Sequence, residues 1–258
     1  MTTCANPNAG DVAEAEAVAS RWNLARLERP RRGPVSELLR QAVTLLVVER
    51  GGVSLLDEEG SARWSVGLAA LRLRALDAGG QGEALVSLGG LALGEHVLDC
   101  TLGLAQDARV ASRLVGRTGR VVALEASLPL AVFAAEGLRR EAPATRNAAL
   151  EIRHADFRNV LATLPEASFD VVLFDPMFSR ERRAQPSFSL LRRLANLERL
   201  DAGTLELARR VARRVVLVKA PRYGPELKAL GLNPERASRS APVVWARAVA
   251  HGRVADAP

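Results

Sequence analysis

Short apolar runs alternate with amphipathic stretches along the second half of this 258-residue chain, and this alternation limits the possible folds more than any other feature. Strands are expected at residues 97–100, 120–126, 150–156, 169–176, 214–221 and 243–250. Helices are expected between them, at residues 107–115, 128–140, 158–164, 190–200 and 204–213. Strands separated by helices form βαβ units. We therefore predict an α/β protein with a doubly wound, mainly parallel sheet.

The first 90 residues follow a different pattern and are predicted to form a small N-terminal α+β extension. Apolar runs flank Gly51 and Gly52, and a glycine pair suits a tight turn, so residues 43–57 are expected to form a β-hairpin. A helix is expected near residues 13–27, whereas residues 66–76 fit either a short helix or an extended segment. We place the boundary with the main domain, residues 91–258, after residue 90.

Composition excludes several classes of protein. Two cysteines cannot build a disulfide scaffold, and three histidines far apart in sequence give no metal-binding spacing, so no metal is expected. No apolar run approaches the roughly 20 residues that span a bilayer. The N-terminal residues lack the apolar core of a secretory signal, and we expect a cytoplasmic protein.

The net charge is +7, and all but two of the 36 basic residues are arginine. One interpretation is a GC-rich gene, which favours arginine codons whatever the function. The other is a polyanionic partner, because arginine contacts to phosphates add affinity and speed association. Charge alone does not decide between them.

Ligands of doubly wound sheets bind beyond the carboxyl ends of the strands, so the residues that end each strand are candidates for a site. Asp99 to Gly103 follows the first strand of the main domain and leads into a helix whose N–H groups can face a ligand. A single glycine is not the dinucleotide fingerprint, and Asp107 would repel a pyrophosphate. If this segment is a cofactor loop, it suits S-adenosylmethionine better than NAD. The alternative is an ordinary βα turn that binds no cofactor.

Three further strand ends carry polar or aromatic side chains. Glu125, 20 residues after Ala105, can accept hydrogen bonds from ribose hydroxyls. Asp156 can accept one from an adenine amino group, with Phe157 against the ring, or it can simply cap the next helix. Lys219 and Tyr223 can hold a phosphate or stack on a base, or belong to a structural loop.

The stretch Asp175-Pro176-Met177-Phe178 is the most informative of these strand ends. A carboxylate and the carbonyl of the following proline can accept the two N–H bonds of a planar exocyclic amine, while an aromatic ring stacks on the base. This arrangement aims the amine nitrogen at a methyl donor. A plain strand-ending turn is the alternative.

Together these residues resemble the Rossmann-like class I S-adenosylmethionine-dependent methyltransferases. More narrowly, they resemble the RsmJ-type family, which methylates a guanine N2 amine in small-subunit ribosomal RNA. The likeness covers about residues 80–225 and is carried by the stretches DCTLGLAQDA, LEA, HADF, DPMF and VKAPRYGP. The chain departs from the family at Ala105-Gln106, where the family has Gly-Arg, at Ala126, where it has Arg, and at Phe157, where it has Ser.

The resemblance implies an S-adenosylmethionine-dependent N-methyltransferase that acts on a guanine amine in ribosomal RNA. The cofactor-binding residues expected from it are Asp99, Thr101, Gly103, Gln106, Asp107, Glu125, Ala126, Asp156, Phe157 and Asp175. The expected catalytic residues are Asp175, Pro176 and Phe178, and the expected substrate-binding residues are Met177, Arg180, Lys219 and Tyr223. A protein or small-molecule substrate, or a non-catalytic RNA-binding protein on a degenerate fold, are the alternatives. The oligomeric state is open.

Overall fold

A computed structural model describes residues 1–29, 34–65, 67–80, 83–141, 145–176, 186–195, 200–223, 225–235 and 242–251. The chain divides into two units. The first contains residues 1–65, 127–143 and 181–195, and the second contains residues 66–126, 144–180 and 196–258. The expected boundary at residue 90 thus differs from the observed division after residue 65, and two later segments join the N-terminal unit.

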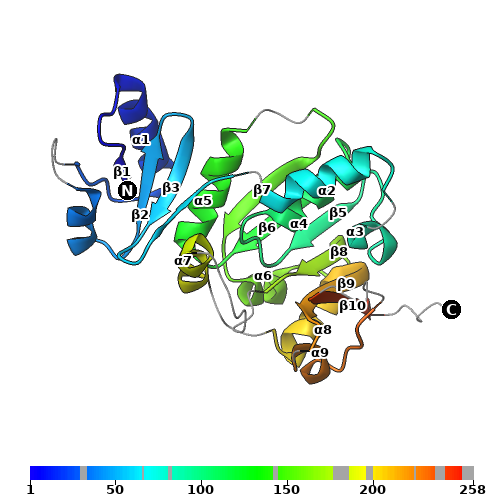
Figure 1. Ribbon diagram of the computed structural model, residues 1–258. Helices are drawn as coiled ribbons and strands as arrows, with labels where there is room; N and C mark the ends of the chain where they lie inside the picture. The colour runs from blue at the N-terminus through cyan, green and yellow to red at the C-terminus, as the bar shows by residue number, and fades with distance from the viewer. Residues whose placement is uncertain are drawn as a thin grey trace. The chain divides into compact units, whose positions relative to one another are not determined.

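The second unit is built on a six-stranded sheet with the order β10-β9-β8-β5-β6-β7 (Figure 1). The strands are β5 (His96–Asp99), β6 (Arg120–Glu125), β7 (Ala149–His154), β8 (Phe169–Phe174), β9 (Ala212–Pro221) and β10 (Val243–Val249). Neighbouring strands are parallel, apart from the antiparallel pair of β9 and β10. This confirms the predicted mainly parallel sheet.

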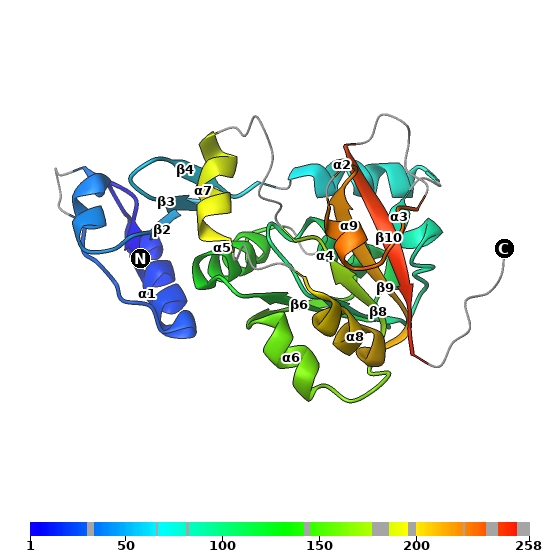
Figure 2. The ribbon, with the colours of Figure 1, turned by 90° about the horizontal axis from the view of Figure 1, so that it is seen from below.

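Helices cover both faces of this sheet (Figure 2). They are α2 (Gly67–Asp77), α3 (Ala84–Ser87), α4 (Gln106–Val115), α6 (Phe157–Thr163), α8 (Ala202–Val211) and α9 (Glu226–Ala229). Helix α4 contacts β5, β6 and β7 and also contacts α2 and α3, whereas α8 contacts β8, β9 and α6. The segment expected to be either a short helix or extended is thus the helix α2. The contact of α2 with α4 explains why this segment belongs to the second unit.

The core of the second unit is aliphatic. Leu98, Val122, Val172 and Val216, from the four central strands, are essentially inaccessible to solvent. Strands that are buried on both faces read as continuous apolar runs, which is why the sequence pattern located them. No described helix of the chain is long and apolar enough to cross a membrane.

The first unit contains a four-stranded sheet with the order β1-β2-β3-β4. Its strands are β1 (Thr2–Thr3), β2 (Leu45–Glu49), β3 (Gly52–Leu56) and β4 (Ser61–Arg63), and its helices are α1 (Ala9–Trp22), the 3₁₀ helix η1 (Val35–Arg40), α5 (Leu128–Arg139) and α7 (Pro186–Leu194). The predicted hairpin is confirmed as β2 and β3, with Gly51 at φ +72° in the turn. Helix α5 contacts β3, and α7 contacts β4.

Polar and aromatic contacts explain why α5 belongs to this unit. The fully buried carboxylate of Glu136 accepts hydrogen bonds from Arg21 Nη1 at 2.5 Å and from Trp22 Nε1 at 2.9 Å. The ring of Trp64 lies edge-on to Phe133, with 5.4 Å between the centroids. A Cβ atom at Gly137 would lie 2.1 Å from the Trp64 ring, so glycine makes this approach possible.

Candidate active site

Acidic and basic side chains from three strand ends and one helix meet at one edge of the six-stranded sheet. Asp99 ends β5, Asp107 lies in the first turn of α4, Asp175 follows β8, and Lys219 lies in β9. Strand β5 pairs with both β6 and β8, so the chain proceeds from β5 toward one side of the sheet and later returns to the other. Such a switch point is where open α/β sheets bind their ligands.

Lys219 connects two of these acids. Its Nζ lies 2.7 Å from Asp175 Oδ2 and 3.2 Å from Asp107 Oδ2, and it lies 5.2 Å from the centroid of the Trp245 ring. Burial lowers the pKa of the Lys219 ammonium, but the charges of Asp175 and Asp107 outweigh burial and raise that pKa above its ordinary value. Lys219 therefore stays charged between the two carboxylates.

Asp107 is held by cations on both of its oxygens. Arg72 Nη1 donates to Asp107 Oδ1, opposite the contact of Lys219 with Oδ2, and Arg72 also donates to Glu83 at 2.6 Å and 3.0 Å. Burial raises the pKa of Asp107, and the charges of Lys219 and Arg72 lower it below its ordinary value overall. Asp107 therefore orients Lys219, and its expected contact with the cofactor stays a prediction.

Asp99 and Thr101 connect the end of β5 to the end of β8. Asp99 is only 2% exposed, and its Oδ1 accepts a hydrogen bond from the Thr101 amide at 3.0 Å. The Thr101 hydroxyl in turn accepts a hydrogen bond from the Asp175 amide at 2.6 Å. Burial and the negative charge of Asp107 raise the pKa of Asp99 to about 8. Asp99 therefore holds a proton at neutral pH.

Asp175 is the acid of this group that reaches solvent. Its side chain is 36% exposed, whereas that of Asp107 is 5% exposed. Partial burial and the nearby charge of Asp107 raise the pKa of Asp175, and Lys219 opposes both effects, which leaves that pKa at about 6. At neutral pH Asp175 is therefore mostly an ionised acceptor that an incoming molecule can contact.

Gly103 and Glu125 form a second part of the site, across β5 and β6. The Gly103 amide donates to Glu125 Oε2 at 2.9 Å, and Glu125 is buried. Gly103 has φ +50°, and a Cβ atom built on it would meet no heavy atom within 4 Å, so the space beside this turn is open. This part of the structure offers a carboxylate and an open backbone loop.

The two residues that depart from the family pattern after Gly103 have different structural roles. Ala105 precedes α4 in the left-handed conformation, with φ 58°, which is a position that favours glycine. The Gln106 side chain accepts a hydrogen bond from the Ala69 amide in the first turn of α2 and donates to the Leu104 carbonyl at 3.3 Å. Gln106 thus holds α2, and its expected contact with the cofactor stays a prediction.

Of the two residues expected at the end of β7, Asp156 caps a helix and Phe157 packs in the core. Asp156 caps α6, accepts a hydrogen bond from the Arg158 amide at 2.9 Å and pairs with the Arg158 guanidinium, as the alternative interpretation predicted. Phe157 is buried in the core edge-on to Phe174, and its expected contact with a cofactor ring stays a prediction. The Ala126 carbonyl lies 3.1 Å from His154 Nε2.

Pro176 directly follows Asp175 at the edge of the site, and Tyr223 is 93% exposed. The other expected substrate and catalytic positions, Met177, Phe178 and Arg180, lie outside the described residues. Sequence reasoning missed the role of Arg72, which reaches Asp107 from α2. No cluster of metal-ligating side chains occurs in the described part of the chain.

The donor set has a definite chemistry. Carboxylates at neighbouring strand ends suit a ligand that carries hydroxyl groups and positive charge, and the open turn at Gly103 leaves room for it. The loop presents one glycine and a buried acid, which does not suit a pyrophosphate. The residues present therefore fit S-adenosylmethionine, with its ribose hydroxyls, amino group and sulfonium, better than a dinucleotide.

Comparison with known proteins agrees with this chemistry. A family model described as "Putative SAM-dependent methyltransferase" matches residues 38–240. The chain is 30% identical over 239 residues to the uncharacterized protein YpiP of Bacillus subtilis, which covers 90% of this chain and 93% of that protein.

Two ribosomal RNA methyltransferases are also similar to the chain. It is 31% identical over 162 residues to ribosomal RNA small subunit methyltransferase J of Erwinia tasmaniensis, which covers 59% of this chain and 63% of that protein. It is 35% identical over 156 residues to the protein of the same name from Laribacter hongkongensis, which covers 57% of this chain and 54% of that protein. The matched regions thus span less than two thirds of these two relatives.

A solved structure shows the same fold. The crystal structure of a SAM-dependent methyltransferase from Neisseria gonorrhoeae superimposes with a TM-score of 0.64 at 19% identity, over 98% of this chain and 96% of that one. The family match extends across both units described above. The chain belongs to the family of S-adenosylmethionine-dependent methyltransferases.

Proposed function

We propose that this methyltransferase acts on the exocyclic N2 amine of a guanine in small-subunit ribosomal RNA. The observation that carries the proposal is the position of Asp175: of the three acids at the switch point, it is the one with an exposed side chain, and Pro176 follows it. The names of the two ribosomal RNA methyltransferases support RNA as the substrate.

Asp175 and Pro176 act by positioning. The Asp175 carboxylate and the Pro176 carbonyl accept the two N–H bonds of the amine, which favours a more pyramidal nitrogen whose lone pair points at the methyl donor. Lys219, 2.7 Å from Asp175, favours the ionised form of that carboxylate. Ionised Asp175 would also accept the proton that the nitrogen loses after transfer.

The cofactor would be held at the neighbouring strand ends. S-adenosylmethionine, when bound, supplies an electrophilic methyl group. Glu125 would accept hydrogen bonds from the ribose hydroxyls, and the turn at Gly103 would admit the cofactor close to the backbone. The Ala155 amide donates to the Glu125 carbonyl at 3.0 Å, which ties the end of β7 to the end of β6. Asp156 follows Ala155 and would therefore lie toward the adenine end of the cofactor.

The arginines are not all available for RNA. Arg193 of α7 donates to Asp57 at 2.6 Å and pairs with Glu59 at 3.0 Å, within the first unit. The neighbouring arginine lowers the pKa of Asp57, although burial opposes that shift. We therefore assign Arg193 to the internal structure of the unit rather than to the RNA backbone.

The experiment is methyl transfer from labelled S-adenosylmethionine to small ribosomal subunits and to their naked RNA, followed by digestion to nucleosides and mass spectrometry. We expect N2-methylguanosine. Asp175→Asn is expected to reduce transfer by about 100-fold or more, the loss typical of a removed positioning or electrostatic contact, with cofactor affinity retained. Glu166→Gln, at an exposed loop before β8, is the matched control. Label found only in protein, or full activity of Asp175→Asn, would contradict the proposal.

A further inference from the structure

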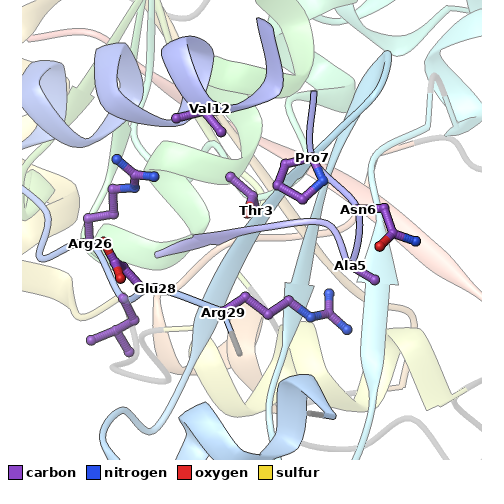
Figure 3. A pocket seen from close by; sticks show the side chains of 9 residues that line it. Thr3, Ala5, Asn6, Pro7, Val12, Arg26, Glu28 and Arg29 are labelled. Atoms are coloured by element: carbon purple, nitrogen blue, oxygen red, sulfur yellow. The ribbon is translucent and has the colours of Figure 1, made fainter. Parts of the chain in front are cut away.

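The first unit contains a cavity of about 620 Å³ that belongs to neither the strand ends nor the acids described above (Figure 3). Its walls come from the N-terminal segment, from α1 and from the segment after α1. Among the lining residues are Thr3, Asn6, Pro7, Val12, Arg26 and Arg29. We call it the N-terminal cavity. Its volume lies in the range of about 300–1,000 Å³ that is typical of small-ligand sites.

The walls of the N-terminal cavity are held together by backbone contacts. The N-terminal amine of Met1 donates to the Ala25 carbonyl at 2.6 Å, and the Leu27 amide donates to the Met1 carbonyl at 2.8 Å. On the other side, the Cys4 amide donates to the Val48 carbonyl of β2 at 2.9 Å. The segments before and after α1 are thus tied to each other and to the sheet, which makes the cavity part of the folded unit.

The charged side chains that line the cavity are Arg26, Arg29 and Glu28. Arg29 Nε is buried and has no hydrogen-bond partner in the described part of the chain. Because this nitrogen is closed to solvent, an acceptor in the cavity would meet the other N–H groups of the Arg29 guanidinium, which lines it. Arg26 pairs with Glu16 at 2.5 Å, but both side chains are partly exposed, so this pair can open to an incoming anion. Glu28 also lines the cavity and opposes part of the positive charge.

The remaining walls are apolar or neutral. Pro7, Val12 and Leu27 provide apolar surface, while Asn6 provides an amide that can both donate and accept. A nucleotide matches these walls, because it carries an anionic phosphate next to a base whose faces are apolar and whose edges form hydrogen bonds. Arg31 and Arg32 follow Arg29 in the sequence, which adds basic charge along the chain.

We propose that the N-terminal cavity receives one nucleotide of a single-stranded segment of the substrate RNA, with Arg29 donating to its phosphate. A cavity of this size accepts a base that has left its stack, which occurs in single-stranded RNA. The identity of the ligand as RNA rests on the proposed function. The first unit would then hold the RNA at a point distinct from the amine that is methylated.

The test is the fluorescence anisotropy of a labelled single-stranded RNA of about a dozen nucleotides, titrated with the full chain at several salt concentrations. Arg29→Ala is expected to raise the Kd about tenfold and to reduce the slope of log Kd against log salt by about one. Arg63→Ala removes an arginine of the same unit that is 61% exposed and paired with Glu49, so it is the matched control and should bind like the wild type.

A second variant separates the cavity from surface charge. Ala5→Phe places a ring in the cavity without changing charge, and we expect it to weaken RNA binding with an unchanged salt slope. An unchanged circular dichroism spectrum and an unchanged thermal unfolding midpoint show that both variants fold, and unchanged S-adenosylmethionine affinity shows that the second unit is intact. Wild-type RNA binding by both variants would overturn this inference even if guanine methylation is found. If both variants lose RNA binding but no RNA is methylated, the cavity assignment stands and the proposed reaction fails.

Discussion

Lys219 Nζ lies 2.7 Å from Asp175 Oδ2, which connects the last parallel strand of the sheet to the acid that follows its neighbour. The same ammonium lies 3.2 Å from Asp107, whose other oxygen is held by Arg72. Since Asp107 and Arg72 are largely buried, they fix the place of Lys219. The ionisation of Asp175, whose side chain is 36% exposed, is therefore set in part by Lys219 and by the groups that hold Lys219 in place.

The first prediction concerns the pH dependence of methyl transfer. Asp175, with a pKa of about 6, must be ionised to accept the amine, so kcat/KM should fall as pH decreases through about 6. Lys219→Met removes the charge that opposes protonation, so the acid limb should move to higher pH, and Lys219→Arg should restore part of the wild-type profile. Lys228→Met, at the other lysine and exposed on α9, is the control. A uniform loss of kcat with an unchanged pH profile would show that Lys219 is only structural.

The second prediction is that protonation of Asp99 makes the free energy of unfolding depend on pH. Its pKa of about 8 lies above its ordinary value, so between about pH 4 and pH 8 the folded chain holds a proton that the unfolded chain has lost. The free energy of unfolding should therefore fall as pH rises through this window. Asp99→Asn retains an acceptor for the Thr101 amide but does not titrate, so this fall should become shallower, as measured by urea unfolding from pH 5 to pH 8.

Asp201→Asn is the control for this measurement. Asp201 accepts a hydrogen bond from the Thr204 amide at 2.7 Å, which lowers its pKa, so both folded and unfolded states have lost this proton above pH 5. Its removal should lower stability without changing the slope from pH 5 to pH 8. Equal slopes for the wild type and Asp99→Asn would contradict the assignment of a raised pKa to Asp99.

The third prediction is that the charge of Glu125 strengthens the binding of S-adenosylmethionine. Glu125→Gln keeps an acceptor for the Gly103 amide but removes the charge that strengthens hydrogen bonds to ribose hydroxyls. We expect S-adenosylmethionine to bind about 1–3 kcal/mol more weakly, which is roughly 5-fold to 150-fold in Kd. Calorimetric titration measures this, with Glu151→Gln on β7, at an exposed position, as the control. An unchanged Kd would show that the ribose is held elsewhere.

The fourth prediction is that replacement of Ala105 by glycine stabilises the protein. Because Ala105 has φ 58°, Ala105→Gly relieves left-handed strain, and we expect a gain of about 0.5–1 kcal/mol after the greater entropy of the unfolded glycine is counted. Ala108→Gly, one turn later inside α4, should instead lose about 1 kcal/mol. Denaturant unfolding of the two variants compares them directly. Destabilisation of both by similar amounts would argue against strain at Ala105.

Local patterns in the sequence were sufficient to predict the six strands of the main sheet, most helices and the hairpin at Gly51-Gly52, but not β1 or β4. Buried parallel strands are continuous apolar runs, and turns need particular residues, so each element leaves a mark within a few positions of itself. The acids at the strand ends could be predicted for the same reason: once the strands are parallel, their carboxyl ends meet. Asp99, Glu125 and Asp175 lie where this argument expected them.

Only the tertiary structure decided how those acids are partnered. Arg72 reaches Asp107 across 35 positions of the sequence, and Lys219 reaches it across 112, because strand order and the placement of α2 bring them together. The same applies to Phe157, whose ring is part of the core, and to α5, which joins the N-terminal unit through Glu136 and Trp64. Sequence periodicity records which face of an element is buried, but it does not record which distant element buries it, and that choice sets the charge and ionisation of the site.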